Sequence, residues 1–252
     1  MHDPSPASLM SPAGRQAFDR RMTQLLQAYA FAAARTEVVQ TLHTLSHPIV
    51  APCLALEGAT VTLAGWSQLQ DQVLQPDPQR QRRCAAVQLA LSEYTDRMEP
   101  DGSEQPAIEI SLLHDDRFPF ATASLAEIMT QHPRGSAWPG ESFSSIHELL
   151  TVHGFDALTG ALKQGVDVDQ DASPADIARV QAAVHVAGWY LGVRWQETAA
   201  AVIHRDGLPR PIPVIVATHG LCPLVYVAHM PPQSAPRRWW QWWRGWPFGM
   251  RD

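Results

Sequence analysis

The pattern of apolar positions begins with a long helical stripe near the N-terminus. Apolar and small side chains recur at spacings of three and four over 18–39, which is the period of one buried helix face. Ser11 and Pro12 have the residue types that cap and begin a helix. Pro48 disfavours helical geometry at the residue before it. The pattern therefore predicts one long amphipathic helix over about 12–46.

After this helix the pattern changes to short apolar runs bounded by turn residues, which is typical of β-strands. Pro100, Asp101 and Gly102 have the residue types that a tight turn requires, so the runs on either side of them are predicted to pair. The strands predicted in this part are Ile49–Leu56, Ala59–Leu63, Ala86–Tyr94 and Ala107–Leu113.

Capping signals predict three further helices. In two of them a Ser precedes a Glu by three residues, which is the spacing of a capping box. The first of these two helices is predicted to start at Ser124 and end at Pro133, and the second to start at Ser145 and end at Gly154. The third is longer, because Ser173 and Pro174 favour a helix start and the apolar residues keep helical spacing up to residue 193. We therefore predict a second substantial helix near 174–193.

The rest of the chain alternates short apolar runs with turns, at Thr198–His204, Ile212–Thr218 and Leu224–His229. Three short strands joined by tight turns predict an antiparallel meander. The whole pattern predicts an α+β fold with antiparallel sheet(s), a long N-terminal helix and the second long helix. We expect a single body over 1–236, followed by a separate tail over 237–252.

Composition indicates a globular protein of a reducing compartment. Of the 252 residues, 45% are apolar and 17% are charged, which is the ordinary globular range. Cys53, Cys84 and Cys222 form no disulfide pattern, the N-terminus has no secretion signal, and the longest apolar stretches are too short or too broken for a membrane span. We therefore expect a cytoplasmic protein, and the single lysine against eighteen arginines is typical of a GC-rich bacterial genome.

Charge is unevenly distributed along the chain. Residues 101–173, the acidic segment, carry twelve acidic and three basic residues, whereas 237–252 carry one acidic and four basic residues. This acidity disfavours nucleic acid as a partner, because phosphate binding needs Lys and Arg. It favours a face for a positively charged protein, and the alternative is an ordinary solvated surface. The residues assigned to this face are Glu104, Glu109, Asp115, Asp116, Glu141, Glu148 and Asp156.

Histidines and cysteines give two weak candidates for chemistry. His43 and His47 share one helix face and Cys53 follows, but the ligand set for zinc is incomplete, so surface or capping roles are favoured. A second set, His204, His219, Cys222 and His229, lies in the predicted meander. A Cys with a neighbouring His is the minimum for nucleophilic catalysis, but an apolar run around the thiol favours a buried, inert one.

Asp167, Asp169 and Asp171 imitate the start of a calcium loop. The sixth and twelfth positions are Ala172 and Ala178 instead of the Gly and Glu that such a loop requires, so a solvated turn is favoured. The sequence has no glycine-rich phosphate loop, nucleophile elbow or paired Cys-x-x-Cys motif. We therefore assign no catalytic residue, metal or cofactor.

The C-terminal tail concentrates indoles beside guanidinium groups. Its composition resembles that of Trp/Arg-rich membrane-active peptides, whose side chains favour the lipid headgroup region. The alternative is that the indoles anchor the tail to the body or to a partner protein. The anchoring residues are Arg237, Arg238, Trp239, Trp240, Trp242, Trp243 and Trp246.

These observations favour a binding protein over an enzyme. The hypothesis is a non-catalytic intracellular protein that binds another protein, with a bacterial immunity protein as the specific version. Such a protein would neutralise a basic toxin domain through an acidic face. The rival hypotheses are an enzyme or metal-dependent protein that uses the C-terminal His/Cys set, and a peripheral membrane protein that acts through its Trp/Arg tail.

Overall fold

The fold combines helices with one mixed sheet, which confirms the α+β class. The computed structural model describes residues 6–76, 83–98, 104–114, 143–146, 149–166, 173–210, 212, 214–218 and 227–229. Its elements are α1 (Pro6–Leu9), α2 (Pro12–Gln27), α3 (Phe31–His43), α4 (Val50–Glu57), β1 (Thr62–Ala64), α5 (Trp66–Leu74), β2 (Ala86–Met98), β3 (Glu104–Leu113), β4 (Phe143–Ile146), β5 (Thr151–His153), α7 (Asp156–Val166), α8 (Pro174–Asp206), β6 (Val214–Thr218) and β7 (Val227–His229). The predicted tail lies outside the described residues, so the division of the chain at residue 236 stays a prediction.

The N-terminal stripe forms two helices instead of the single helix predicted over 12–46. Ser11 caps α2 as expected, because its hydroxyl accepts a hydrogen bond from the Gly14 amide at 3.0 Å. α2 then ends in a Schellman motif, in which Tyr29 has a φ of 55° and the amide of Ala30 donates to the Leu25 carbonyl at 2.9 Å. Glycine usually takes this left-handed position. With Tyr there, the sequence gives no sign of the break.

Three of the predicted elements have a different structure. Residues 49–56 form most of helix α4 instead of a strand, and 198–204 continue α8 instead of forming a strand. Short apolar runs are ambiguous in this way, and three consecutive alanines, Ala199–Ala201, favour a helix. Ser145 lies in strand β4 and does not start a helix. The helix predicted at Ser124 lies outside the described residues.

The described strands follow the order β1-β5-β3-β2-β6-β7, and β4 also pairs with β3. The predicted antiparallel pairing of β2 with β3 is confirmed, with Val87 opposite Leu112. β6 pairs in parallel with β2 and antiparallel with β7. The sheet is therefore mixed, which corrects the prediction of a purely antiparallel one. A parallel pair needs a long crossover between its strands, and α8 belongs to that crossover.

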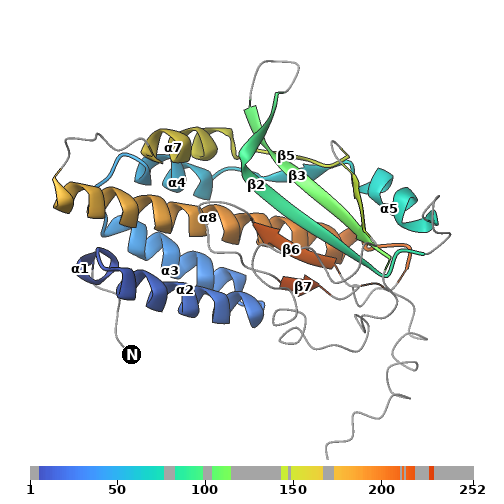
Figure 1. The fold of residues 1–252 in the computed structure, drawn as a ribbon, viewed down its shortest axis with the longest axis horizontal. Coiled ribbons are helices and arrows are strands. Elements are labelled where there is room, and N and C mark those ends of the chain that lie inside the picture. Colours follow the sequence, from blue (N-terminus) through green and yellow to red (C-terminus); the bar gives the residue numbers. More distant parts are fainter. Residues whose placement is uncertain are drawn as a thin grey trace, which may run out of the picture.

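The long helix α8 is the axis around which the core forms. Figure 1 shows it along the length of the molecule, with α2 and α3 on one side, α4 and α7 on the other, and the sheet towards its C-terminal end. The predicted helix near 174–193 is confirmed and continues to Asp206, after which Gly207 has a φ of 62°. Trp189 and Trp195 are fully buried on α8. The indole nitrogen of Trp195 donates to the Ala217 carbonyl of β6 at 2.9 Å.

Candidate functional site

The most concentrated group of charges in the described residues lies where α3, α4 and α8 meet. Its centre is Arg194, whose side chain is only 9% exposed. The Arg194 guanidinium donates to the carbonyl oxygens of Leu56 at 2.9 Å and Ala59 at 3.3 Å. Leu56 lies in the last turn of α4 and Ala59 lies two residues beyond its end, where the helix dipole favours a cation. The guanidinium therefore holds the end of α4 against α8.

Two further acceptors, one on α4 and one on α8 itself, share the same guanidinium. Arg194 lies 3.4 Å from Glu57 Oε1 and donates to the Tyr190 hydroxyl at 3.2 Å. The Tyr190 hydroxyl in turn donates to Glu57. Burial, and then the hydrogen bond to Glu57, raise the pKa of Tyr190 above its ordinary value. The hydroxyl is thus kept protonated and acts as a donor, not as a base.

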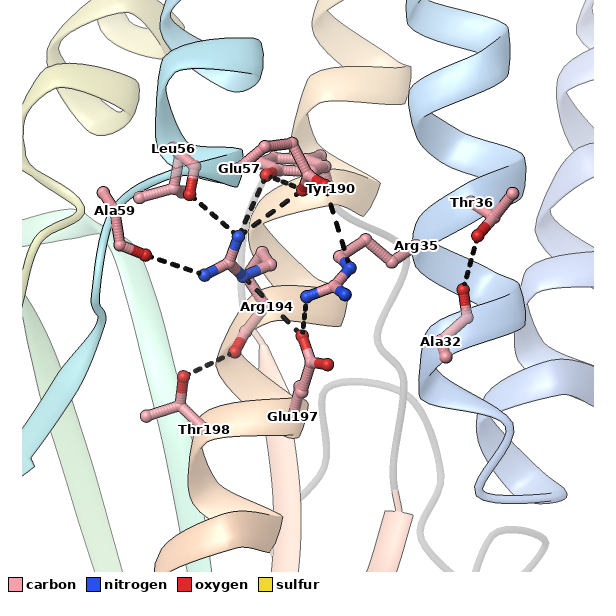
Figure 2. Close-up of polar contacts among 10 residues, drawn as sticks. All are labelled: Ala32, Arg35, Thr36, Leu56, Glu57, Ala59, Tyr190, Arg194, Glu197 and Thr198. Atoms are coloured by element: carbon pink, nitrogen blue, oxygen red, sulfur yellow. Dashed lines mark hydrogen bonds and ion pairs between the residues drawn. The ribbon is translucent and has the colours of Figure 1, made fainter.

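A second guanidinium completes this group, which we call the Arg194 cluster (Arg35, Glu57, Tyr190, Arg194 and Glu197; Figure 2). Arg35 of α3 lies 3.1 Å from Glu197 and 3.9 Å from Glu57, and Arg194 lies 3.7 Å from Glu197. Two cations thus face two carboxylates. Because these groups neutralise one another, the arrangement is suited to clamping three helices together.

A smaller polar group joins α2 to α8. One carboxylate oxygen of Asp19 lies 2.7 Å from His185 Nε2 and accepts a hydrogen bond from the Trp189 indole at 2.7 Å. The Phe18 ring packs edge-on against Trp189. An Asp–His pair also occurs in catalytic triads. Here the carboxylate also satisfies a fully buried indole N–H, which is a structural role.

Neither group was among the predicted sites. The Arg194 cluster has a signal in the sequence, because Arg194 stands between Val193 and Trp195 at the end of a largely apolar run that begins at Val186. Tyr190 and Glu197 lie four residues before it and three after it, on the same helix face. The partners Arg35 and Glu57 come from distant parts of the chain, and only the folded structure reveals them.

The histidines near the end of α3 have separate roles. His43 is exposed, whereas the Nδ1 of His47 accepts a hydrogen bond from the Ile49 amide at 3.2 Å, just before α4. Burial lowers the pKa of His47 and raises the pKa of the fully buried Cys53 to about 12. Within the described ranges, no three His, Cys, Asp or Glu side chains gather in a way that would hold a metal ion.

The predicted C-terminal His/Cys set is only partly described. His204 is exposed in the last turn of α8, and His229 ends strand β7. His219 and Cys222 lie outside the described residues, as do Asp167, Asp169 and Asp171. The described members thus belong to different elements.

The described elements of the acidic segment are neighbours in the fold. β4 and β5 both pair with β3, and α7 packs against β3 and α8. Glu109 is exposed on β3, Asp156 is exposed at the start of α7, and Glu104 begins β3. The other residues predicted for the acidic face lie outside the described residues: Asp115, Asp116, Glu141 and Glu148.

The tail residues assigned as anchors all lie in 237–252, outside the described part of the chain. Among the helices that are described, none is both long and apolar enough to cross a membrane. No family model, curated protein or solved structure matches this chain.

Proposed function

We propose that this protein is a non-catalytic binder of another protein and that its acidic segment forms the binding region. One observation carries the proposal. The described elements of that segment, β3, β4, β5 and α7, lie next to one another. The segment has twelve acidic residues and only three basic ones, and its three described acidic residues, Glu104, Glu109 and Asp156, lie on two of these neighbouring elements, β3 and α7.

A concentrated negative charge selects a basic partner. Complementary charge steers association and raises its rate, with a strong dependence on salt. The specific version of the proposal is a bacterial immunity protein that neutralises a basic toxin, for example a nuclease whose own site attracts phosphate. In such a pair the acidic face would occupy the surface that the toxin uses for its substrate.

The test reverses two exposed charges of the acidic segment, in the variant E109K/D156K. The matched control, D71K/D206K, reverses two acidic residues that are exposed on α5 and at the end of α8. Proteins that the wild-type chain captures from a host lysate at low salt are identified. The association rate of each is then measured with the wild-type chain and with the two variants. We expect a basic partner whose association slows about tenfold or more with E109K/D156K and stays unchanged with D71K/D206K.

Two outcomes would contradict the proposal. One is a partner whose association rate is equal for the three chains, since the acidic segment would then have no part in binding. The other is a partner with an acidic or neutral surface whose association is insensitive to salt, because steering by charge requires screening by salt.

A further inference from the structure

The sheet has a second buried face, on the side away from α8. Strand residues alternate between the two faces of a sheet, and Val87, Leu89 and Leu91 of β2 belong to the core around α8. Ala86 and Ala90 point the other way, and they are 0% and 2% exposed. Both faces of β2 are therefore buried.

The buried apolar residues of this second face form a group of their own. Five buried apolar residues in the described part of the chain lie outside the main core cluster. The strand register places all of them on the second face of β2, β3 and β6. They are Ala86, Ala90, Leu113, Ile215 and Ala217. A separate apolar layer of this kind needs a cover of its own.

The extent of this layer is limited. On β3 the same face is more open, because Ala107 and Ser111 are partly exposed and Glu109 is exposed. The fully buried part thus centres on β2 and β6, where Ala90 is paired with Ala217 and Gln88 with Ile215. Because alanine side chains are short, a covering group can pack close to the strands here, and Glu109 stands at the border of this area.

The C-terminal segment leaves the sheet beside this layer. β7 ends at His229, which is paired with Val214 of β6, and Val214 is paired with Val87 of β2. Seven residues, 230–236, separate β7 from the Trp/Arg-rich tail and span up to about 25 Å when extended. β2 lies two strands from β7 in the sheet order, which is roughly 10 Å. The tail is thus long enough to reach the whole layer.

The chemistry of the tail suits an apolar layer of small residues. It contains five tryptophans and Phe248, and each aromatic side chain buries about 150–250 Å² when it is covered. Its arginines have charged heads that can stay in water at the border while their stems pack against the rings. We propose that residues 237–252 dock on the second face of the sheet, over β2 and β6, as a cover for Ala90, Ile215 and Ala217.

The first test measures how well the face is protected. The variant A90C is made with C222A, in the full-length chain and in a chain that ends at residue 236. Cys53 and Cys84 are fully buried, and burial raises the pKa of each to about 12, so both react slowly with a thiol reagent. We expect truncation to raise the labelling rate of A90C about tenfold or more, because an uncovered thiol needs no opening step.

A matched control is S111C, which lies on the same face where it is partly exposed. Its labelling rate should be similar in the two chains. Equal labelling of A90C in the full-length and truncated chains would overturn the proposal, because the tail would then give no protection. A labelling rate for S111C that rises together with that of A90C would indicate general unfolding.

The second test uses the full-length chain and decides the question if truncation unfolds the protein. The variant A90C/W242C/C222A is treated with a short bismaleimide over a range of protein concentrations. Docking predicts a cross-link between the two positions within one chain at every concentration. Failure to cross-link, or cross-links only between chains at high concentration, would show that the tail does not cover its own sheet.

Lipid is the other occupant that the tail's composition favours. Full-length and truncated chains are sedimented with anionic vesicles of phosphatidylcholine and phosphatidylglycerol. If only the full-length chain sediments and A90C is equally reactive in both chains, the tail is a lipid anchor and the docking proposal is wrong. If A90C is protected by the tail and vesicles bind neither chain, docking is supported.

Discussion

Charged side chains meet opposite conditions in the Arg194 cluster and in the acidic segment. In the cluster, each guanidinium lies within 4.0 Å of two carboxylates, and Arg194 is almost completely buried. In the acidic segment, twelve acidic residues share three basic ones, and the two whose exposure is described, Glu109 and Asp156, are exposed. The first arrangement neutralises itself, whereas the second keeps a net negative charge.

The difference contrasts charge that holds the fold together with charge to which the proposed function gives a role in attracting a partner. Buried charges are costly unless they are paired and hydrogen-bonded, so removing one member of the Arg194 cluster should affect stability strongly. Exposed charges contribute little to stability but act over several ångströms on an approaching partner. Substitutions in the two regions should therefore change different measured quantities.

The largest effect on stability is expected for Arg194→Met. This change removes the donors to the carbonyls of Leu56 and Ala59 and leaves the Glu57 carboxylate without its most buried partner. Breaking a buried ion pair by removing one partner costs about 3–5 kcal/mol, and urea unfolding should show a loss of this size. Arg205→Ala, at an exposed arginine of the same helix, should leave the urea midpoint unchanged. A similar loss in the two variants would contradict the proposed clamp.

A smaller loss is expected for Asp19→Ala, which tests the contact between α2 and α8. The substitution removes the acceptor of the fully buried Trp189 indole N–H and the partner of His185. A buried donor without an acceptor costs about 1–3 kcal/mol. Asp19→Asn keeps a side-chain oxygen and should therefore lose less than half as much in the same urea titration. Equal losses would mean that the negative charge matters more than the acceptor.

Tyr190→Phe should cost about 1 kcal/mol at neutral pH, because it removes one hydroxyl from a network whose other members remain paired. Its effect also depends on pH. Burial and the hydrogen bond to Glu57 raise the pKa of Tyr190, so folding favours the protonated phenol. The resulting stability is complete below the unfolded pKa of about 10 and is lost as the pH rises beyond it.

The stability difference between the wild-type chain and Tyr190→Phe should therefore shrink above pH 10. It is measured by urea unfolding at several alkaline pH values. Both chains also contain Cys53 and Cys84, whose pKa values are raised to about 12, and their contributions cancel in the difference. A difference that stays constant through this range would contradict the role given to the phenolic proton.

The spacing of apolar residues correctly predicted those elements whose capping or turn residues agree with the pattern of burial. The start of α8 follows from Ser173 and Pro174, and the pairing of β2 with β3 follows from two apolar runs around a turn. It failed where different structures share a pattern. Residues 49–56 are an apolar run that suits a strand or a buried helix. The helix is favoured only because α4 packs against both α7 and α8 in the folded protein.

The candidate sites were harder to predict than the elements, for a physical reason. The Arg194 cluster is assembled from α3, α4 and α8, and several of its contacts join residues more than 130 positions apart, such as Arg194 and Glu57. No local spacing encodes such a contact. By contrast, the acidity of 101–173 is visible in the sequence, but the sequence does not reveal that the described elements β4, β5 and α7 meet β3.

The smallest effects on stability are expected in the acidic segment, where they separate folding from binding. Glu109→Lys should change the free energy of unfolding by less than about 0.5 kcal/mol, as is usual for exposed positions. Asp156→Lys should cost about 0.5–1 kcal/mol, because Asp156 is in the first turn of α7, where the helix dipole favours a negative charge. Both variants should nevertheless slow association with a basic partner. A charge reversal that weakens binding only in proportion to lost stability would place Glu109 and Asp156 with the Arg194 cluster, as residues that maintain the fold.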